Sequence, residues 1–206
     1  MVNLGMKVVG VSRKSLGAAQ QEAIFPRQKG QTGEMFFIQG DVIKPDDVSR
    51  IIKWTRNEFG RTDVLVNAAG SFHNYDILKT RDKEKIGEMI EAKISGTLLF
   101  SNAVIVDMLA TQIKNGHIIT TSSIIGKQDW RLYAGLYIAG QGTMSIITSV
   151  LKNEVKKVKL PVRVTEIPST SKLTMYANQT DEDIAEEICN VVSLPILVIA
   201  ERAAII

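Results

Sequence analysis

The stretch that decides the fold is Asp63-Val64-Leu65-Val66-Asn67-Ala68-Ala69-Gly70, a short apolar run that ends in an Asn-Ala-Ala-Gly turn. A short run rich in Val and Leu indicates a strand that is buried on both faces. Other short apolar runs share this pattern and predict further strands, namely Met6–Val11, Met35–Gln39, Gly116–Ser122, Leu160–Ile167 and Leu197–Ala200.

Helical segments separate these strands. They are predicted over Ser15–Ile24, from Pro45 onward, over Thr80–Lys114 with a break near Gly96, over Tyr133–Val158 and over Asp181–Ser193. Strands that alternate with helices of this length form parallel βαβ units. The sequence therefore predicts the α/β class, with a doubly wound parallel sheet of the Rossmann type, as one domain over residues 1–206.

Composition limits the classes of function. The net formal charge is +3 and the basic residues are mostly scattered, which argues against a nucleic-acid partner. Cys189 is the only cysteine, so no internal disulfide forms, as in a reducing compartment. No stretch reaches the roughly eighteen apolar residues of a membrane span. His73 and His117 do not form a metal-ligand cluster. We expect a cytoplasmic protein without a metal site.

Polar side chains follow the predicted strands. Arg13, Asp41, Asn67 and Ser123 all fall at or just past a strand end. In doubly wound sheets, ligands bind at the carboxyl ends of the strands, near the point where the strand order reverses. This placement predicts a ligand site at that edge of the sheet.

Three fragments in order resemble the short-chain dehydrogenase/reductase family. They are Asn67 to Gly70, then Ser122-Ser123-Ile124-Ile125-Gly126, then Tyr137-Ile138-Ala139-Gly140-Gln141. In that family they correspond to an Asn-Asn-Ala-Gly turn, a catalytic serine and a Tyr-x-x-x-Lys pair. Further stretches resemble the branch that includes dehydrogenase/reductase member 11 and insect farnesol dehydrogenases, namely Gly5–Gly10 with Arg13, Gly116–Ile119, and Asp183–Ala185 before Leu194-Pro195.

The resemblance implies an oxidoreductase that acts on the hydroxyl or carbonyl group of a small apolar alcohol or ketone. Ser123 matches the serine that hydrogen-bonds the substrate oxygen, with Ser122 beside it. Tyr137 matches the acid/base tyrosine, and Tyr133, one helical turn earlier, is its rival. Gln141 takes the place of the catalytic lysine, so the third member of the catalytic set carries no charge.

The resemblance also implies a cofactor and the residues that hold it. Arg13 at a strand end implies NADP(H), because a basic residue accommodates the 2′-phosphate. The alternative is a solvated arginine. Asp41 and Val42 match the residues at the adenine ring, or Asp41 caps the next turn. Asn67, Ala69 and Gly70 match the turn beneath the cofactor, or they only stabilise the sheet.

The missing lysine charge has a chemical consequence. A tyrosine near its reference pKa of about 10 is ionised only on the order of a thousandth at neutral pH. Oxidation needs a base and suffers more than reduction with a neutral tyrosine as the acid. Lys93 loosely matches the family's asparagine of the proton relay and replaces part of that charge if it points inward, although a surface lysine is the usual case. Pro168-Ser169 stands where the family has Pro-Gly, in a loop.

The match begins late in the family pattern, since Met1 to Gly5 corresponds to the end of the family's first helix. The first strand and the glycine-rich phosphate loop have no counterpart in these residues. A strand missing from the centre leaves two inner edges unpaired or forces them to pair directly. The alternative function is therefore a pseudoenzyme, a binding or scaffold subunit. The helices over Leu98–Lys114 and Tyr137–Val158 match the family's dimer interface, so a homo-oligomer is expected.

Overall fold

The computed structural model describes residues 1–17, 21, 30, 32–70, 82–123, 135–169 and 181–193. The predicted strand over Leu197–Ala200 and the rival Tyr133 lie outside these residues, as does most of the predicted helix over Ser15–Ile24. The statements below concern the described residues alone.

The other predicted strands and helices are confirmed. The strands are β1 Lys7–Ser12, β2 Glu34–Gln39, β3 Val64–Asn67, β4 Gly116–Ser123 and β5 Val162–Ser169. The helices are α2 Pro45–Phe59, α3 Lys83–Ile90, the π-helix η2 Glu91–Ser95, α4 Gly96–Ala110, α6 Gly135–Lys157 and α7 Asp181–Ser193, with a short 3₁₀ turn η1 Val2–Leu4 at the start. One expectation was wrong in detail, because Pro168 and Ser169 end β5 as ladder partners of Ser122 and Ser123 rather than lying in a loop.

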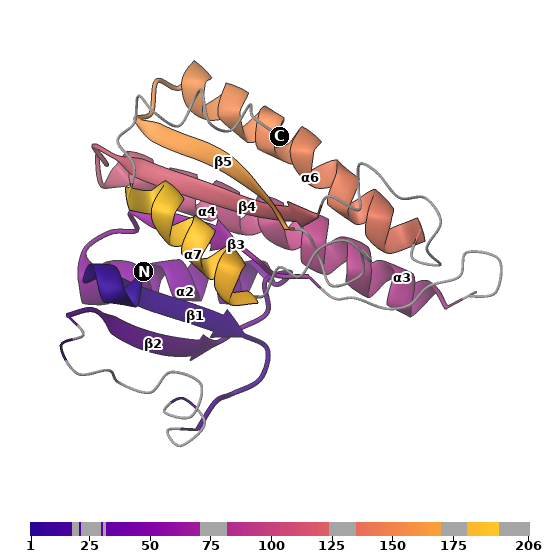
Figure 1. The fold of residues 1–206 in the computed structure, drawn as a ribbon, viewed down its shortest axis with the longest axis horizontal. Helices are drawn as coiled ribbons and strands as arrows, with labels where there is room; N and C mark the ends of the chain where they lie inside the picture. Colours follow the sequence, from indigo (N-terminus) through magenta and orange to yellow (C-terminus); the bar gives the residue numbers. More distant parts are fainter. Residues whose placement is uncertain are drawn as a thin grey trace.

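The strands form two parallel sheets rather than one (Figure 1). β1 pairs with β2, and β3, β4 and β5 pair in that order. β1 and β3 are neighbours in space but share no ladder within the described chain (Figure 1). Of the two outcomes that the sequence left open, two unpaired inner edges or direct pairing, the structure has the first.

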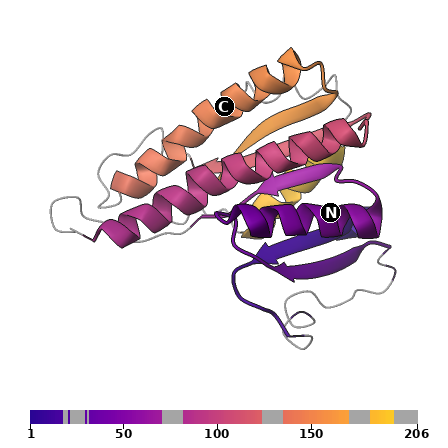
Figure 2. The same cartoon turned by 180° about the vertical axis from the view of Figure 1, so that it is seen from behind.

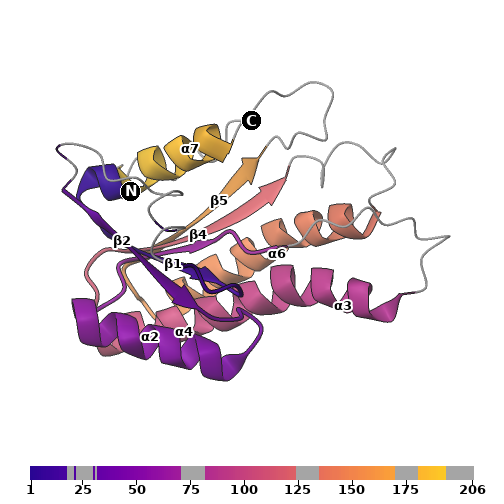
Figure 3. The ribbon, with the colours of Figure 1, turned by 90° about the horizontal axis from the view of Figure 1, so that it is seen from below.

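Helices cover both faces of the strands. Seen from below, α2, α4 and α6 lie on one side and α7 on the other (Figure 3). α4 and α6 run side by side along the covered face (Figure 2). This layering is that of a doubly wound α/β fold.

The boundaries of α2 follow from local chemistry. Pro45 occupies the first turn, where its missing N–H costs nothing, and Asp46 and Asp47 place negative charge at the positive end of the helix dipole. Gly60 ends the helix at φ 86°, which glycine adopts without a Cβ clash. The buried residues Val48 and Ile51 of α2 pack with Phe100 of α4.

The long helix formed by α3, η2 and α4 changes its winding just before Gly96, where the sequence predicted a break. A Cβ at Gly96 would lie 2.6 Å from a methyl group of Val42. The glycine therefore lets the loop after β2 approach the helix closely. The segment Lys83–Ala110 is long and apolar enough to cross a membrane. Two charged residues of this segment, Lys93 and Asp107, are buried inside the protein, as in a core helix of a folded domain.

Asp107 of α4 joins the two halves of the fold. Its side chain is 1% exposed and pairs with Arg56 at the end of α2, whose Nη2 lies 2.5 Å and whose Nε lies 2.6 Å from Oδ1. The backbone N–H of Thr62, just before β3, donates to the other carboxylate oxygen at 3.3 Å. One buried carboxylate thus ties α2 and the entry of β3 to α4.

We expect Arg56→Met to destabilise the protein by about 3 kcal/mol or more, because it leaves the Asp107 carboxylate buried with little compensation. Arg61→Met is the matched control, since Arg61 and Asp63 form an ion pair whose side chains are both about half exposed. Its cost should stay below about 1 kcal/mol. Urea unfolding of both variants measures the difference, and equal losses would show that Asp107 does not hold the halves together.

Candidate active site

The carboxyl ends of the strands carry the candidate site. α6 begins at the edge where β4 and β5 end (Figure 1). A cavity of about 130 Å³ lies there. Gly70 after β3, Lys93 of η2, and Tyr137 and Gln141 of α6 line it. Residues from three separate segments thus meet in one cavity, whereas Asn67 and Ser123, which the sequence placed at this edge, do not line it. Most of the remaining lining is apolar.

Tyr137 and Gln141 form the centre of this site. They lie one turn apart on α6, and a side-chain hydrogen bond joins them. Gln141 is 7% exposed, and its Oε1 has no partner among the described residues. The bond therefore runs through the amide nitrogen, which donates to the phenol oxygen. Burial raises the pKa of Tyr137, and the hydrogen bond from Gln141 opposes that rise only in part. At neutral pH the tyrosine is a neutral acid.

Lys93 is buried, which corrects the expectation of a surface lysine. It is 7% exposed, and its Nζ donates to the Thr121 carbonyl oxygen at 2.7 Å and to Thr121 Oγ1 at 3.3 Å. Burial lowers its pKa to about 8. Its aliphatic stem passes Gly70, where a Cβ would lie 3.3 Å from Lys93 Cδ. The cavity therefore contains a lysine that remains mostly protonated at neutral pH.

The structure separates the two adjacent serines. Ser122 donates to Glu166 Oε1 at 2.5 Å, and Ser145 of α6 donates to the same oxygen at 2.7 Å. Ser123 points to the opposite face, as successive strand residues do. It is 1% exposed, and its Oγ has no hydrogen-bond partner in the described part of the chain. Ser123 does not line the cavity with Tyr137.

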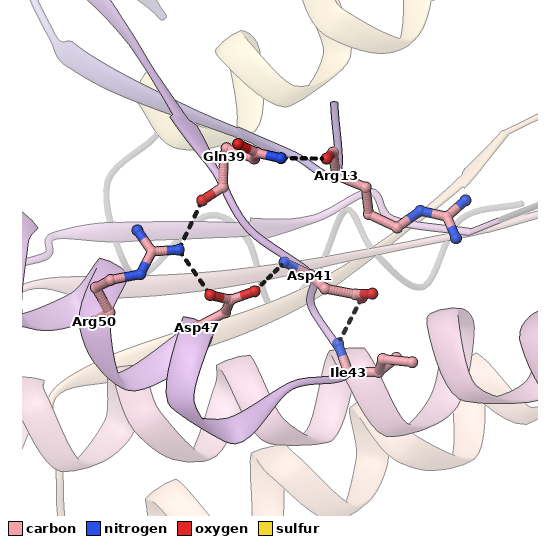
Figure 4. A network of polar contacts seen from close by, with 6 residues as sticks. All are labelled: Arg13, Gln39, Asp41, Ile43, Asp47 and Arg50. Carbon is pink, nitrogen blue, oxygen red and sulfur yellow. Dashed lines mark hydrogen bonds and ion pairs between the residues drawn. The ribbon is translucent and has the colours of Figure 1, made fainter. Parts of the chain in front are cut away.

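Arg13 and Asp41 lie at a second cleft, beyond β1 and β2. This cleft has a volume of about 450 Å³ and is also lined by Lys44. Asp41 Oδ1 accepts from the Ile43 N–H at 3.2 Å, which is the turn-capping geometry (Figure 4). The carbonyl oxygen of Arg13 accepts from the Gln39 side chain, while its guanidinium extends away from this network (Figure 4).

The other residues predicted at the cofactor make contacts within the fold. Asn67 Nδ2 donates to Ser101 Oγ at 3.1 Å, which ties the end of β3 to α4. Val42 packs in the apolar cluster around Phe100. Ala69 lines a cavity between β1 and β3 rather than the cavity at Tyr137. Only Gly70 of this group borders the cavity at Tyr137.

Sequence reasoning gave no role to Glu166 and underestimated Lys93. The signal for Lys93 was its loose match to the family's asparagine of the proton relay. No local signal marks Glu166, because its partners Ser122 and Ser145 come from two other elements.

The parallel α/β fold with helices on both faces of its strands defines the Rossmann-like class. Residues 1–185 match the family described as short chain dehydrogenase, so the chain belongs to that family. The resemblance drawn from the sequence motifs is thereby confirmed.

Similar sequences include farnesol dehydrogenase of Aedes aegypti, 26% identical over 211 residues, with 95% of this chain and 83% of the relative covered. An uncharacterised oxidoreductase of Staphylococcus saprophyticus is 32% identical over 181 residues, covering 88% of this chain and 74% of the relative. A 3-oxoacyl-[acyl-carrier-protein] reductase of Synechocystis is 32% identical over 148 residues, covering 72% of this chain and 58% of the relative.

Solved structures share the fold. A metagenomic short-chain oxidoreductase in complex with NADP aligns with a TM-score of 0.76 at 22% identity, over 94% of this chain and 82% of that one. Serine dehydrogenase from Escherichia coli aligns with a TM-score of 0.73 at 23% identity, over 94% of this chain and 83% of that one.

We expect Lys93→Met to stabilise the protein at pH 7 and to lose that advantage as the pH rises. The folded state holds Lys93 at a pKa of about 8, against 10.5 unfolded, so the unfolded chain binds more protons between these values. The variant avoids a penalty of roughly 3 kcal/mol that is fully present below pH 8, less about 1 kcal/mol for the lost hydrogen bond.

Denaturant unfolding from pH 7 to pH 10 measures this effect as a shrinking gap between the variant and the wild type. Lys152→Met, at an exposed position of α6, is the control and should keep a constant gap. A constant gap for Lys93→Met as well would mean that Lys93 is solvated.

Proposed function

We propose that this chain is an NADP(H)-dependent oxidoreductase that acts on the carbonyl or hydroxyl group of a small apolar ketone or alcohol and that favours reduction. The observation that carries the proposal is the Tyr137 hydroxyl, half-buried beside an apolar cavity and joined to Gln141. Membership of the short-chain dehydrogenase family supports the reaction class.

In this mechanism Tyr137 is the proton donor. When bound, the reduced nicotinamide supplies a hydride to the carbonyl carbon. Tyr137 gives its proton to the oxygen, so that carbonyl, hydride and proton balance as the alcohol. Ser123, the serine that the resemblance implies, does not line the cavity at Tyr137, so it is given no contact with that oxygen here. Gln141 Nε2 holds the phenol and stabilises the phenolate that the transfer leaves.

The chain offers residues suited to the cofactor at both ends. Arg13 and Lys44 border the cleft beyond β1 and β2, and a 2′-phosphate would find two cations there. At the other end, Gln141 Oε1 in the cavity has no partner among the described residues, and a bound group would satisfy it. The NADP found in a structure of similar fold supports the choice of cofactor.

Burial raises the pKa of Tyr137, so the phenol stays protonated at neutral pH. A neutral phenol can donate its proton directly when the carbonyl is reduced. Alcohol oxidation needs the phenolate, which burial disfavours and which Gln141 assists only as a neutral donor. Lys93 is nearby in the cavity, but its Nζ is engaged by Thr121. We therefore expect slow turnover, with reduction faster than oxidation at neutral pH.

Tyr137→Phe should lower ketone reduction by NADPH at least about a hundredfold, because general acid catalysis contributes on that scale or more. NADPH affinity, followed by fluorescence titration, should change far less than the rate, since Arg13 and Lys44 at the proposed 2′-phosphate end are unaltered. Tyr133→Phe is the matched control and should keep full activity. Loss of activity in Tyr133→Phe with retention in Tyr137→Phe would overturn the assignment of the acid.

A second candidate is a non-catalytic binding or scaffold subunit. The observation that favours it is the internal use of two implied cofactor contacts, since Asn67 bonds Ser101 and Asp41 caps its own turn. The NADPH titration separates the two candidates. No binding at millimolar NADPH together with no turnover would support the second candidate, whereas binding with Tyr137-dependent turnover supports the first.

The oligomer is part of the proposal. Large apolar side chains are exposed on the helices α4 and α6, which run side by side, namely Leu98, Val106 and Leu109 on α4 and Ile146 and Val150 on α6 (Figure 2). Apolar side chains gathered on one face mark a contact surface, and homodimers with two-fold symmetry are the commonest soluble oligomers. We infer that α4 and α6 pair with those of a second copy.

The double variant Val106→Glu/Ile146→Glu should convert a dimer into a monomer by light scattering at micromolar concentration, since these side chains are 56% and 66% exposed in the single chain. Val158→Glu is the control, because Val158 is 51% exposed but lies beyond the end of α6. A wild-type monomer at that concentration would contradict the inferred interface.

A further inference from the structure

Lys93 differs from the other lysines of this chain in its surroundings. Its side chain is 7% exposed, whereas the other lysines whose burial the structure describes are all exposed. It is the middle residue of the π-helix η2, and π-helical turns inside longer helices frequently occur at functional sites. A lysine is almost never fully buried unless its charge is paired. The partners of Lys93 therefore decide what this burial means.

Lys93 forms no ion pair within the described chain. Its Nζ donates to the Thr121 carbonyl oxygen at 2.7 Å and to Thr121 Oγ1 at 3.3 Å, and both of these acceptors are neutral. Burial lowers the pKa of Lys93 to about 8, because no nearby negative charge opposes the loss of solvation. These surroundings favour the neutral amine more than water does.

The contacts with Thr121 suit a neutral amine as well as an ammonium group. A neutral amine has two N–H groups and one lone pair. The carbonyl oxygen and Oγ1 of Thr121 accept one N–H each, and Oγ1 is free to accept because its own proton goes to the Asn67 carbonyl oxygen at 3.1 Å. Both N–H groups are then satisfied, and the lone pair of Nζ is left for another group.

The cavity beside Lys93 suits a small apolar molecule. It has a volume of about 130 Å³, and the apolar side chains Met89, Ile94 and Leu136 line it together with Lys93. Tyr137 is the other titratable residue among the described lining residues, and burial keeps its hydroxyl protonated at neutral pH. A small molecule in this cavity thus meets an amine, a neutral acid and an apolar wall.

We propose that Lys93 is a nucleophilic lysine that captures short aliphatic aldehydes in this cavity as a reversible imine. The lone pair of Nζ attacks the carbonyl carbon, so that a C–N bond forms and the C–O bond breaks. Counted from the ammonium form, two protons leave Nζ and depart with the carbonyl oxygen as water. The third proton stays on the iminium nitrogen, where the Thr121 carbonyl oxygen accepts it. The step needs no oxidant, reductant or cofactor.

The lining and the amine together select this class of ligand. An apolar lining favours an aliphatic chain, and the small volume favours a short one. An amine attacks a carbonyl only when it is unprotonated. With a pKa of about 8, roughly a tenth of Lys93 is in that form at pH 7, against less than about a thousandth of an amine at the reference pKa of about 10.4. Lys93 should therefore react before the exposed lysines.

The inference shares the cavity of the proposed function but does not rest on it. Imine formation uses Nζ of Lys93, whereas the proposed reduction uses the proton of Tyr137 and a bound cofactor. An aldehyde held on Lys93 occupies the place of a substrate, so capture should compete with reduction. The test accordingly omits NADPH.

The full chain is incubated with butanal and cyanoborohydride at pH 7, and the modified residues are then located by peptide mass spectrometry. The reductant converts each imine into a stable butyl amine. Butylation of Lys93 should exceed that of Lys152, which is exposed on α6, at least tenfold. The ratio of the two should fall as the pH rises to 10, because exposed lysines gain neutral amine over that range.

A second measurement follows the imine without a reductant. Butanal labelled with ¹³C at its carbonyl carbon should give one imine signal with the wild-type chain, and dilution should remove it. Lys93→Arg keeps a positive charge but has no primary amine, so this variant should lose the signal. Lys152→Arg is the matched control and should keep it. If Lys93→Arg does not fold, the butylation ratio in the wild-type chain still decides the matter.

Two outcomes would overturn the proposal. Equal butylation of Lys93 and Lys152 at pH 7 would mean that the buried amine is not activated. An imine signal that persists in folded Lys93→Arg would mean that another amine captures the aldehyde. Butylation of Lys93 in a chain that neither binds NADPH nor reduces ketones would support the inference while the proposed function fails. Ketone reduction without butylation of Lys93 would have the reverse meaning.

Discussion

The fold depends on the packing of α2 against α4 and on the one buried carboxylate that fixes it. β1–β2 and β3–β4–β5 share no ladder hydrogen bonds in the described chain, so the two sheets hold their relative position through these helices. The Asp107 carboxylate pairs with the Arg56 guanidinium and accepts a hydrogen bond from the Thr62 N–H. Burying a carboxylate is costly unless every partner is in place, which makes the joint specific as well as stable. Phe100 and Ile51 supply the apolar part of the same contact.

The two parts of the candidate site lie on different sheets, and this contact between α2 and α4 holds the sheets together. Tyr137, Gln141 and Ser123 belong to the three-stranded sheet and α6, while Arg13 follows β1 of the other sheet. A dinucleotide that reached from Arg13 to Tyr137 would cross the line between the sheets. The affinity of such a ligand thus depends on how rigidly α2 holds to α4.

Sequence pattern was enough for the elements and their class. Short Val-rich runs and helical stretches with acids at their start recur along the chain, and local propensity agrees with the fold at each of them. The pattern could not show that the Asn67 side chain hydrogen-bonds Ser101, or that Lys93 is buried. Both facts depend on side chains from distant elements meeting, as Lys93 meets Thr121 across 28 positions of sequence. The sequence left open whether the two inner strand edges would pair. Hydrophobic periodicity indicates which residues are buried, but it does not indicate which strand edges pair.

Lys93 and Gln141 together explain why the site has a cation without an activated tyrosine. The family pattern places a charged donor beside the phenol, and this chain has a neutral amide there. Lys93 restores a positive charge to the cavity, but its Nζ points to the Thr121 carbonyl, and burial has already lowered its pKa to about 8. Neither feature brings the charge to the phenol oxygen, and burial raises the pKa of Tyr137. A charge in the same cavity is therefore not equivalent to a charge on the reacting hydroxyl, and the chemistry left to Tyr137 is that of an acid.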